Sequence, residues 1–461
     1  MTTISRNPRL LIAGAFIATY AAAITMLHGP LNWILAAPVI AIPAALWLSR
    51  SASAWLTLFF AVALLAPPLP IAFGNSGPHP ALAVAAIGVI IGIARIDDWR
   101  FERNQLSGWI VVFFAMLTIS VAAAAIYSGI DLAIESLARV ALAAISAYVF
   151  FYASAGPGRR STVSLTLLFS IAVASAAFAL LDFYFQFPAP AGFGPQFIWL
   201  DTGVFRRAQG LFYEASTLGN FCSFFVVMAA VVFVKRVPLS ALSRVAILAG
   251  GAILFTALIL SYSRSCLVAL GIALAALFLL ERRTTNWKRI AIVTALAGAA
   301  AIAILVRFFP EYADLYWTRL SGSLDLALDS NARVLSGRVE SWQTLLAFLA
   351  EHPWHALIGV GYKTLPYSNF TGEPIVADNM YLSILIETGV FGLAALIALN
   401  LAIVRAGYRA ARSEDRNQSF YGTWIFCFWI AQSVQMLSAD LLTFWRVLPV
   451  YFWVLAMAVR R

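Results

Sequence analysis

Charged residues are scarce in this chain: they make up 11% of its 461 residues, whereas hydrophobic residues make up 62%. Soluble domains carry about 25% charged residues, so the composition excludes an ordinary soluble protein. Apolar runs of roughly 18 or more residues recur along most of the chain, and each can cross a bilayer as a helix. The composition therefore predicts an all-α polytopic membrane protein, with residues 1–461 forming one integral membrane domain.

Cysteine and histidine are also rare. The three cysteines, Cys222, Cys266 and Cys427, lie in or next to apolar runs, and their odd number argues against a disulfide framework. Of the four histidines, only His352 and His355 are close in sequence, and we interpret this pair as structural rather than as zinc ligands. The sequence has no Gly-x-x-x-x-Gly-Lys phosphate loop and no Gly-x-Ser-x-Gly nucleophile motif. We therefore predict no metal and no cofactor.

The positions of the apolar runs predict about fourteen transmembrane helices. The predicted spans are residues 9–27, 31–49, 53–71, 79–95, 107–126, 136–153, 162–185, 216–234, 242–261, 264–281, 288–308, 380–404, 419–437 and 443–459. The first run resembles a signal peptide, but another span follows at once, so we expect it to be retained.

The net charge of +10 has its explanation in the connectors between the spans. If the N-terminus is cytoplasmic and every span crosses, most of the 31 Lys and Arg residues fall in cytoplasmic connectors, together with few of the 21 acids. This bias is the positive-inside pattern, so it predicts cytoplasmic N- and C-termini and argues against nucleic acid as a partner.

Two long segments then lie on the outer side of the membrane. The first is residues 186–215, and the second is residues 309–379, between the eleventh and twelfth spans. Within the second, Val339, Trp342 and Leu346 recur at helical spacing and predict an amphipathic helix at residues 337–350. Long loops in compact proteins are usually functional, so we expect the site here.

Arginines recur at the outer ends of the spans, where the topology rule does not explain them. They are Arg206, Arg207, Arg264 and Arg338. Guanidinium groups bind phosphate through paired hydrogen bonds, so these residues indicate an anionic ligand at the outer leaflet. The alternative for any single one is an arginine that is salt-bridged or reaches the interface.

Two acids accompany these arginines. Asp378 precedes the twelfth span, and Glu387 lies nine residues further on in it. A carboxylate at such a place can accept the proton of a sugar hydroxyl. The alternatives are that Asp378 is only a helix N-cap and that Glu387 is a buried partner of an arginine.

Taken together, these segments resemble the O-antigen ligase and O-antigen polymerase superfamily of bacterial envelope glycosyltransferases. The matching motifs are Arg207-Ala208-x-Gly210-x-Phe212, Ser263-Arg264-Ser265, Arg338-x-x-x-Trp342, His352-Pro353, Gly359-Val360-Gly361, Asn379-x-Tyr381-Leu382 and Glu387-x-Gly389-x-x-Gly392. Their order, with a long outer loop before the last two, carries the resemblance.

The resemblance implies a metal-independent, inverting glycosyltransferase in the bacterial inner membrane, with its active face in the periplasm. The implied donor is a glycan on undecaprenyl diphosphate, and the acceptor is a sugar hydroxyl of a glycan or glycolipid. Arg206, Arg207 and Arg264 would bind the diphosphate, and Arg338 would support them or orient the acceptor. The implied catalytic residues are Asp378, Arg264 and Arg338. Supporting roles would fall to a further set: Gln209, Asn379, Tyr381 and Glu387.

The family's last motif usually begins with His-Asn, and that His is the favoured base of the ligases. Here the motif begins Asp378-Asn379. We therefore favour a polysaccharide polymerase that joins lipid-linked repeat units, with an O-antigen ligase acting on lipid A core as the alternative. A transporter of anions or lipid-linked sugars, and a scaffold in a polysaccharide export complex, are the alternatives from other classes. A transporter would show paired broken helices in two related halves, which we do not find in the sequence.

Overall fold

The computed structural model describes most of the chain between residues 45 and 460. The described residues are 45, 47–48, 52–69, 78–101, 104–160, 163–188, 196–200, 203–212, 214–238, 240–282, 307, 338–368, 370 and 374–460. The predicted spans at 9–27 and 288–308 lie outside them, apart from residue 307, as do nearly all of span 31–49 and residues 309–337 of the predicted outer loop.

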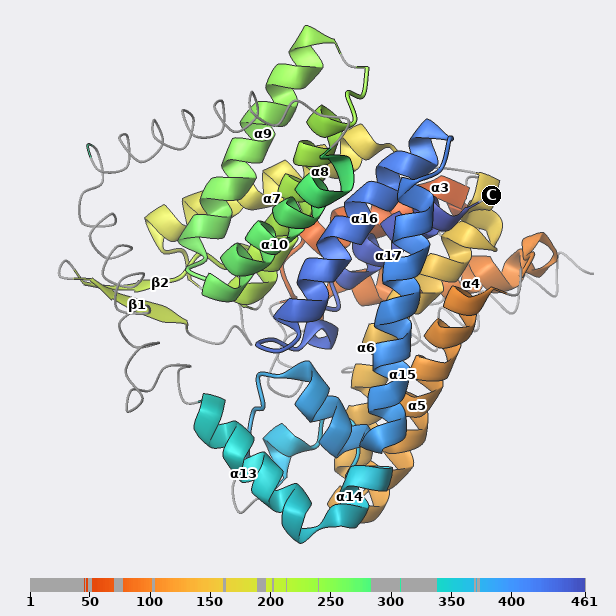
Figure 1. Cartoon of the computed structure of the whole chain (residues 1–461), viewed down its shortest axis with the longest axis vertical. Helices are drawn as coiled ribbons and strands as arrows, with labels where there is room; N and C mark the ends of the chain where they lie inside the picture. Colours follow the sequence, from red (N-terminus) through yellow and green to blue (C-terminus); the bar gives the residue numbers. More distant parts are fainter. Residues whose placement is uncertain are drawn as a thin grey trace, which may run out of the picture.

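Helices dominate the described part of the chain (Figure 1). They are α3 (Ala52–Leu65), α4 (Pro80–Ala94), α5 (Gln105–Ser128), α6 (Ile130–Ser154), α7 (Leu165–Phe185), α8 (Ala215–Val234), α9 (Ala241–Leu260), α10 (Arg264–Glu281), α13 (Arg338–Glu351), α14 (Pro353–Ile358), α15 (Met380–Ala411), α16 (Arg416–Gln435) and α17 (Leu448–Val459). Short 3-10 turns cover Ile96–Asp98, Pro157–Arg160, Leu365–Tyr367 and Leu441–Thr443. A small antiparallel hairpin, β1 (Phe197–Leu200) and β2 (Gly203–Arg206), was not predicted.

Seven helices in the described part are long and apolar enough to cross a membrane: α5, α6, α7, α8, α9, α10 and α15. The apolar helices α3, α4 and α17 are shorter, and their lengths fall below the roughly 17 residues of a full span. The structure is thus that of a helical, multi-pass membrane protein. The total of fourteen spans and the orientation in the membrane stay predictions.

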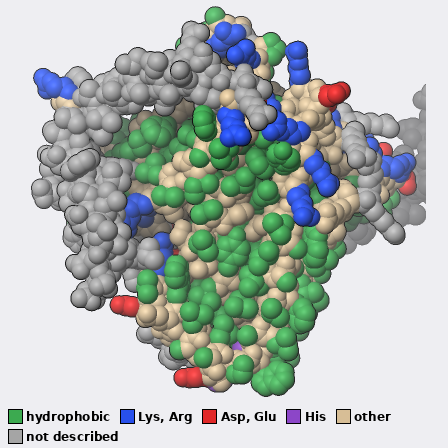
Figure 2. All heavy atoms as spheres, viewed as in Figure 1, with side chains coloured by type: hydrophobic (Ala, Val, Ile, Leu, Met, Phe, Trp, Pro, Cys, Tyr) green, Lys and Arg blue, Asp and Glu red, His purple; other side chains and the backbone are tan. Residues whose placement is uncertain are grey.

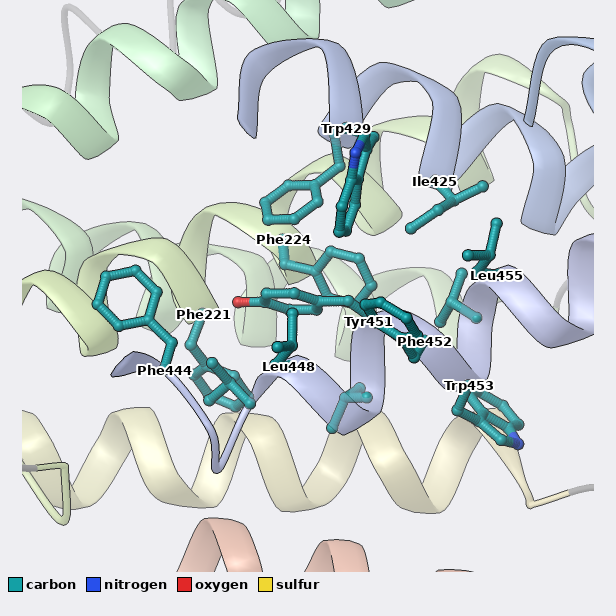
Figure 3. Packing of buried hydrophobic residues seen from close by; sticks show 14 of the residues in the cluster. Phe221, Phe224, Ile425, Trp429, Phe444, Leu448, Tyr451, Phe452, Trp453 and Leu455 are labelled. Atoms are coloured by element: carbon teal, nitrogen blue, oxygen red, sulfur yellow. The ribbon is translucent and has the colours of Figure 1, made fainter. Parts of the chain in front are cut away.

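Helix α17 lies at the centre of the bundle. Every residue from Leu448 to Ala458 is buried, because the helix is apolar on all sides and packs against α6, α15 and α16. The ring of Phe224 lies at a centroid distance of 4.4 Å from that of Tyr451 (Figure 3), and the ring of Phe428 lies at 4.8 Å from it. The hydroxyl of Tyr451 donates to Asn220 Oδ1 of α8 at 2.6 Å. This contact fixes α8 against α17 in the interior.

Helix α15 is broken near its start. Gly389 has φ 75° and ψ −178°, which is outside the helical region, so the segment predicted as one span has two parts. The break exposes carbonyls, and the loop after α14 bonds to them: Val360 N–H donates to Ile386 O at 3.0 Å and Gly361 N–H to Glu387 O at 2.9 Å. A broken helix in a membrane is tolerated where other backbone satisfies its polar groups. The motif at residues 359–361 therefore meets the motif at residues 387–392.

The two ends of the bundle differ in surface chemistry. Helices α13 and α14 lie together at the lower end in Figure 1, next to the first part of α15. Figure 2 shows hydrophobic side chains over the middle of the molecule, whereas Lys and Arg side chains gather toward its upper end in this view. A broad apolar surface with basic side chains gathered toward one end is the surface expected of a protein that contacts lipid.

Candidate active site

A polar cavity of about 310 Å³ lies where several helix ends meet. Its walls come from the loop after β2, the first residues of α8, α10, α13 and α15, the segment between α14 and α15, and the connector after α16. Among the described residues, the charged side chains that line it are four cations, Arg207, Arg264, Arg338 and Lys363, and four carboxylates, Glu214, Asp378, Glu387 and Asp440. We call this the polar cavity.

Arg207 is positioned by the hairpin and by the end of α9. Its backbone N–H donates to Gln196 O at 2.8 Å, and its Nε donates to Ser261 O, also at 2.8 Å. The carbonyls at the C-terminus of a helix attract cations, so the contact with Ser261 is favourable. In the same loop Gly210 has φ +56°, and a Cβ there would approach Ala179 of α7 to 2.7 Å. Only glycine fits at this position, which explains the glycine of the motif.

Arg264 is the first residue of α10. Ser263 precedes it as the N-cap, and the turn from α9 into α10 passes through Tyr262 with φ 50°. The hydroxyls of Ser263 and Ser265 line the cavity with it and lie 3.3 Å apart. The free N–H groups and the dipole at a helix N-terminus favour an anion, so α10 adds to the positive potential on this wall.

Arg338 and Asp378 form an ion pair across the cavity mouth. Arg338 Nε lies 3.2 Å from Asp378 Oδ2, and the two side chains are 29% and 48% exposed. The indole of Trp342 donates to Ala377 O at 2.7 Å, which holds α13 beside Asp378. The N-cap of α15 is Asn379, whose Oδ1 accepts from Leu382 N–H at 3.2 Å. The alternative interpretation of Asp378 as the cap is therefore wrong.

A second ion pair was missed by the sequence analysis. Lys363 Nζ lies 2.5 Å from Asp440 Oδ2, and both side chains are nearly buried. Glu387, 1% exposed, interacts electrostatically with Lys363, so its cationic partner is a lysine and not the predicted arginine. Burial lowers the pKa of Lys363, but Asp440 and Glu387 outweigh it and raise the pKa above its ordinary value.

Glu214 is the other missed carboxylate. It stands at the N-cap position of α8, and its Oε2 accepts from the Ser216 hydroxyl at 2.9 Å. Burial raises the pKa of Glu214 above its usual range. In the sequence, Glu214 and Asp440 look like ordinary connector acids. Their proximity to each other comes only from the packing of α8, α16 and the loop after α14.

Five predicted residues line the polar cavity together: Arg207, Arg264, Arg338, Asp378 and Glu387. Their sequence separation is large, so this convergence depends on the fold.

The other four predicted residues have different surroundings. Arg206 was predicted to bind diphosphate beside Arg207, but its Nη2 forms a buried ion pair with Asp182 Oδ1 of α7 at 2.5 Å. Gln209 is buried in the loop next to it. Asn379 caps α15, and the Tyr381 hydroxyl donates to Ser433 O of α16 at 2.8 Å. These groups position the cavity walls.

The fold and the polar cavity define a class: a multi-pass membrane protein with guanidinium and carboxylate groups gathered in one pocket at a helix-bundle end. Comparison with known families shows which membrane proteins of this class the chain is similar to. Residues 249–397 match the family model described as O-antigen ligase. This match supports membership of the O-antigen ligase superfamily and confirms the predicted resemblance. None of the curated proteins matches the chain.

The matched segment begins within α9 and ends within α15. It includes Arg264, Arg338 and Asp378 and leaves Arg207 and Asp440 on either side of it. The match indicates a membrane glycosyltransferase of the O-antigen ligase or polymerase type, and it implies a lipid-linked oligosaccharide and an acceptor glycan as substrates.

Proposed function

We propose that this protein is a polysaccharide polymerase at the periplasmic face of the inner membrane. It transfers a glycan from undecaprenyl diphosphate to a sugar hydroxyl of a second lipid-linked unit, without a metal and with inversion at the anomeric carbon. The observation that supports this most is the convergence of Arg207, Arg264 and Arg338 with Asp378 in one cavity.

The cations suit the leaving group. When the anomeric C–O bond breaks, its electron pair goes to the diphosphate, which then carries more negative charge than in the donor. Fixed guanidinium groups and the N-terminus of α10 stabilise that developing charge, because they need no reorganisation during the reaction. Arg207 and Arg264 are placed on the same wall by the end of α9 and the start of α10, so both can contact one diphosphate.

The carboxylates suit the acceptor. In the proposed step, the acceptor oxygen attacks the anomeric carbon from the face opposite the diphosphate, and Asp378 takes the hydroxyl proton as general base. Arg338 is the positioning residue, because its ion pair at 3.2 Å orients the Asp378 carboxylate at the cavity mouth. Glu214, Glu387 and the Lys363–Asp440 pair offer hydrogen-bonding groups for other sugar hydroxyls.

The choice of polymerase over ligase depends on one position. The resembling ligases carry His before the Asn of the last motif, and this chain carries Asp378. A carboxylate can accept the same proton, so the substitution preserves the chemistry while changing the group that meets the acceptor.

The test is a reconstitution of the purified full chain. We expect it to convert undecaprenyl-diphosphate-linked oligosaccharide into longer glycan, with release of undecaprenyl diphosphate and no loss of activity in EDTA. Addition of lipid A core separates the alternatives, since a ligase would transfer the glycan to that acceptor and would not elongate the donor alone. Absence of both products, with the protein folded, would refute the transferase proposal.

A further inference from the structure

A second and larger cavity, of about 1230 Å³, lies at the other end of the bundle. Helix α8 reaches the polar cavity through Ser216 near its start and the second cavity through Met228 and Val232 near its end. Helices of this length are about 30 Å long, so the two cavities lie toward opposite ends of α8. In the predicted orientation, the second cavity opens toward the cytoplasm. We call it the inner cavity.

The walls of the inner cavity are mainly apolar. They come from α7, α8, α9 and α16, with Phe169, Val173, Met228 and Ile253 among the lining residues. Gly250 lets α9 approach α7, because a Cβ there would meet Phe169 and Val173 at less than 3 Å. A space of this size with hydrocarbon walls is suited to aliphatic chains, since an unfilled cavity of that volume would be strongly unfavourable.

The rim of the inner cavity is basic. Lys235 and Arg236 directly follow α8, and Arg416 begins α16. Lys235 is already paired with Glu281 at 2.7 Å. In the described part of the chain, no ion pair joins Arg236 or Arg416 to a carboxylate, and the acid that shares the rim is Glu414. The rim therefore keeps an excess of positive charge above an apolar interior.

We propose that the inner cavity binds an anionic phospholipid of the cytoplasmic leaflet. The phosphodiester lies between Arg236 and Arg416, and the acyl chains contact α7, α8 and α9. The apolar walls and the basic rim match the two parts of such a lipid, and basic pockets between transmembrane helices are known to bind anionic headgroups. Nothing in the proposed transfer reaction uses this site, so the inference does not depend on the proposed function.

The test measures lipid binding to the delipidated full chain by native mass spectrometry. Phosphatidylglycerol and phosphatidylcholine of identical acyl chains are the probes. We expect one phosphatidylglycerol to bind at least about tenfold more tightly than phosphatidylcholine, because each basic group near the headgroup adds attraction of that order. Equal affinity for the two lipids would overturn the proposal.

Matched variants locate the site. Arg236→Gln with Arg416→Gln should reduce phosphatidylglycerol binding to the level of phosphatidylcholine. Arg405→Gln with Arg409→Gln removes the same charge from exposed positions of α15 that do not line the cavity, and it should leave binding unchanged. An equal effect of both pairs would mean a diffuse electrostatic attraction and would overturn a defined site.

A separate variant tests the contact between the acyl chains and the apolar wall of the inner cavity. Ala249→Trp fills space from an exposed wall position and should weaken the binding of both lipids, with thermal unfolding as the check on folding. Two competition arms distinguish other sources of phosphate. If inorganic phosphate displaced phosphatidylglycerol at equal concentration, the ligand would be free phosphate and the proposal would be overturned. If undecaprenyl phosphate displaced it at a much lower concentration, the ligand would be the polyprenyl phosphate, which would also overturn the proposal.

Discussion

The adjacent residues Arg206 and Arg207 lie in two different regions of the molecule, the buried interior and the polar cavity. Arg206 enters the bundle interior and pairs with Asp182, with side chains 10% and 4% exposed. Arg207 lines the polar cavity with Arg264 and Arg338. Arg446 is also buried and bonded within the interior. It is 2% exposed, and its guanidinium donates to Ala63 O at 2.8 Å and Ala66 O at 3.0 Å.

The two regions use their charged side chains differently: the interior pairs them with other protein groups, and the polar cavity presents them to a ligand. A buried charge is costly unless other groups of the protein pair with it, so Arg206 and Arg446 are each bonded to groups of other segments. Arg446 also donates to Leu211 O and thereby holds the loop that carries Arg207. The cavity cations instead line a space of about 310 Å³ that an anionic ligand can enter. Substitutions in the two regions should therefore damage different properties.

The largest effect is expected at Asp378. Asp378→Asn removes the proposed base and should lower the rate of glycan elongation by about a hundred- to ten-thousandfold. Asp378→His should retain part of the rate, because imidazole can accept the same proton. The adjacent control is Asn379→Ala, which removes the helix cap and costs about 1 kcal/mol of stability. Full activity in Asp378→Asn would rule out this residue as the base.

In the interior, Asp182→Leu leaves Arg206 buried without its carboxylate. We expect the free energy of unfolding to fall by about 3–5 kcal/mol, which is typical when one member of a buried pair is removed. The double variant Asp182→Leu with Arg206→Met should recover most of it. Reversible unfolding in mixed micelles measures both. If Asp182→Leu left stability unchanged but stopped elongation, Arg206 would belong with the cavity residues.

On the cavity wall, Arg207→Ala or Arg264→Ala should lower elongation by about a hundred- to thousandfold, since each removes a donor from the leaving diphosphate. Stability should change little. Arg207→Lys keeps the charge but loses the paired donors, so it should recover only part of the rate. Arg244→Ala, at an exposed position of α9 outside the polar cavity, is the control. Normal chain length in both alanine variants would refute the catalytic role.

The smallest effect concerns pH. Burial raises the pKa of Glu214 in the folded protein, so the folded state holds this proton at pH values where the unfolded state has lost it. The free energy of unfolding should therefore fall as pH rises from the unfolded pKa through the folded one. Glu214→Gln should remove that part of the slope, as measured by unfolding across the acid range. An identical slope in the variant would mean that Glu214 does not contribute.

Run length and spacing identify helices well. The segments predicted at 162–185, 216–234, 242–261 and 264–281 coincide within a few residues with α7, α8, α9 and α10, because a span needs a continuous apolar stretch that is visible locally. The helix predicted at 337–350 lies where α13 is found. The break of α15 at Gly389 was missed, because it depends on hydrogen bonds from the distant loop at residues 359–361.

Some residues of the polar cavity can also be predicted from the sequence, whereas others depend on tertiary packing. Arginines near span ends stand out in the sequence, since the topology rule leaves them unexplained, and three of the four line the polar cavity. The sequence does not distinguish Arg206 from Arg207, because only the position of Asp182 on α7 determines which of the two forms the buried ion pair. The Lys363–Asp440 pair joins residues 77 positions apart, so it depends on tertiary packing alone.

The central claim is that distant arginines form one diphosphate-binding wall, and the binding of undecaprenyl diphosphate to the folded chain tests it most directly. Native mass spectrometry of the wild type, of Arg207→Ala with Arg264→Ala, and of the Arg244→Ala control gives the comparison. We predict that the double variant binds at least about a hundredfold more weakly, because it loses two charged donors, while the control binds like the wild type. Equal binding by the double variant and the wild type would contradict the account.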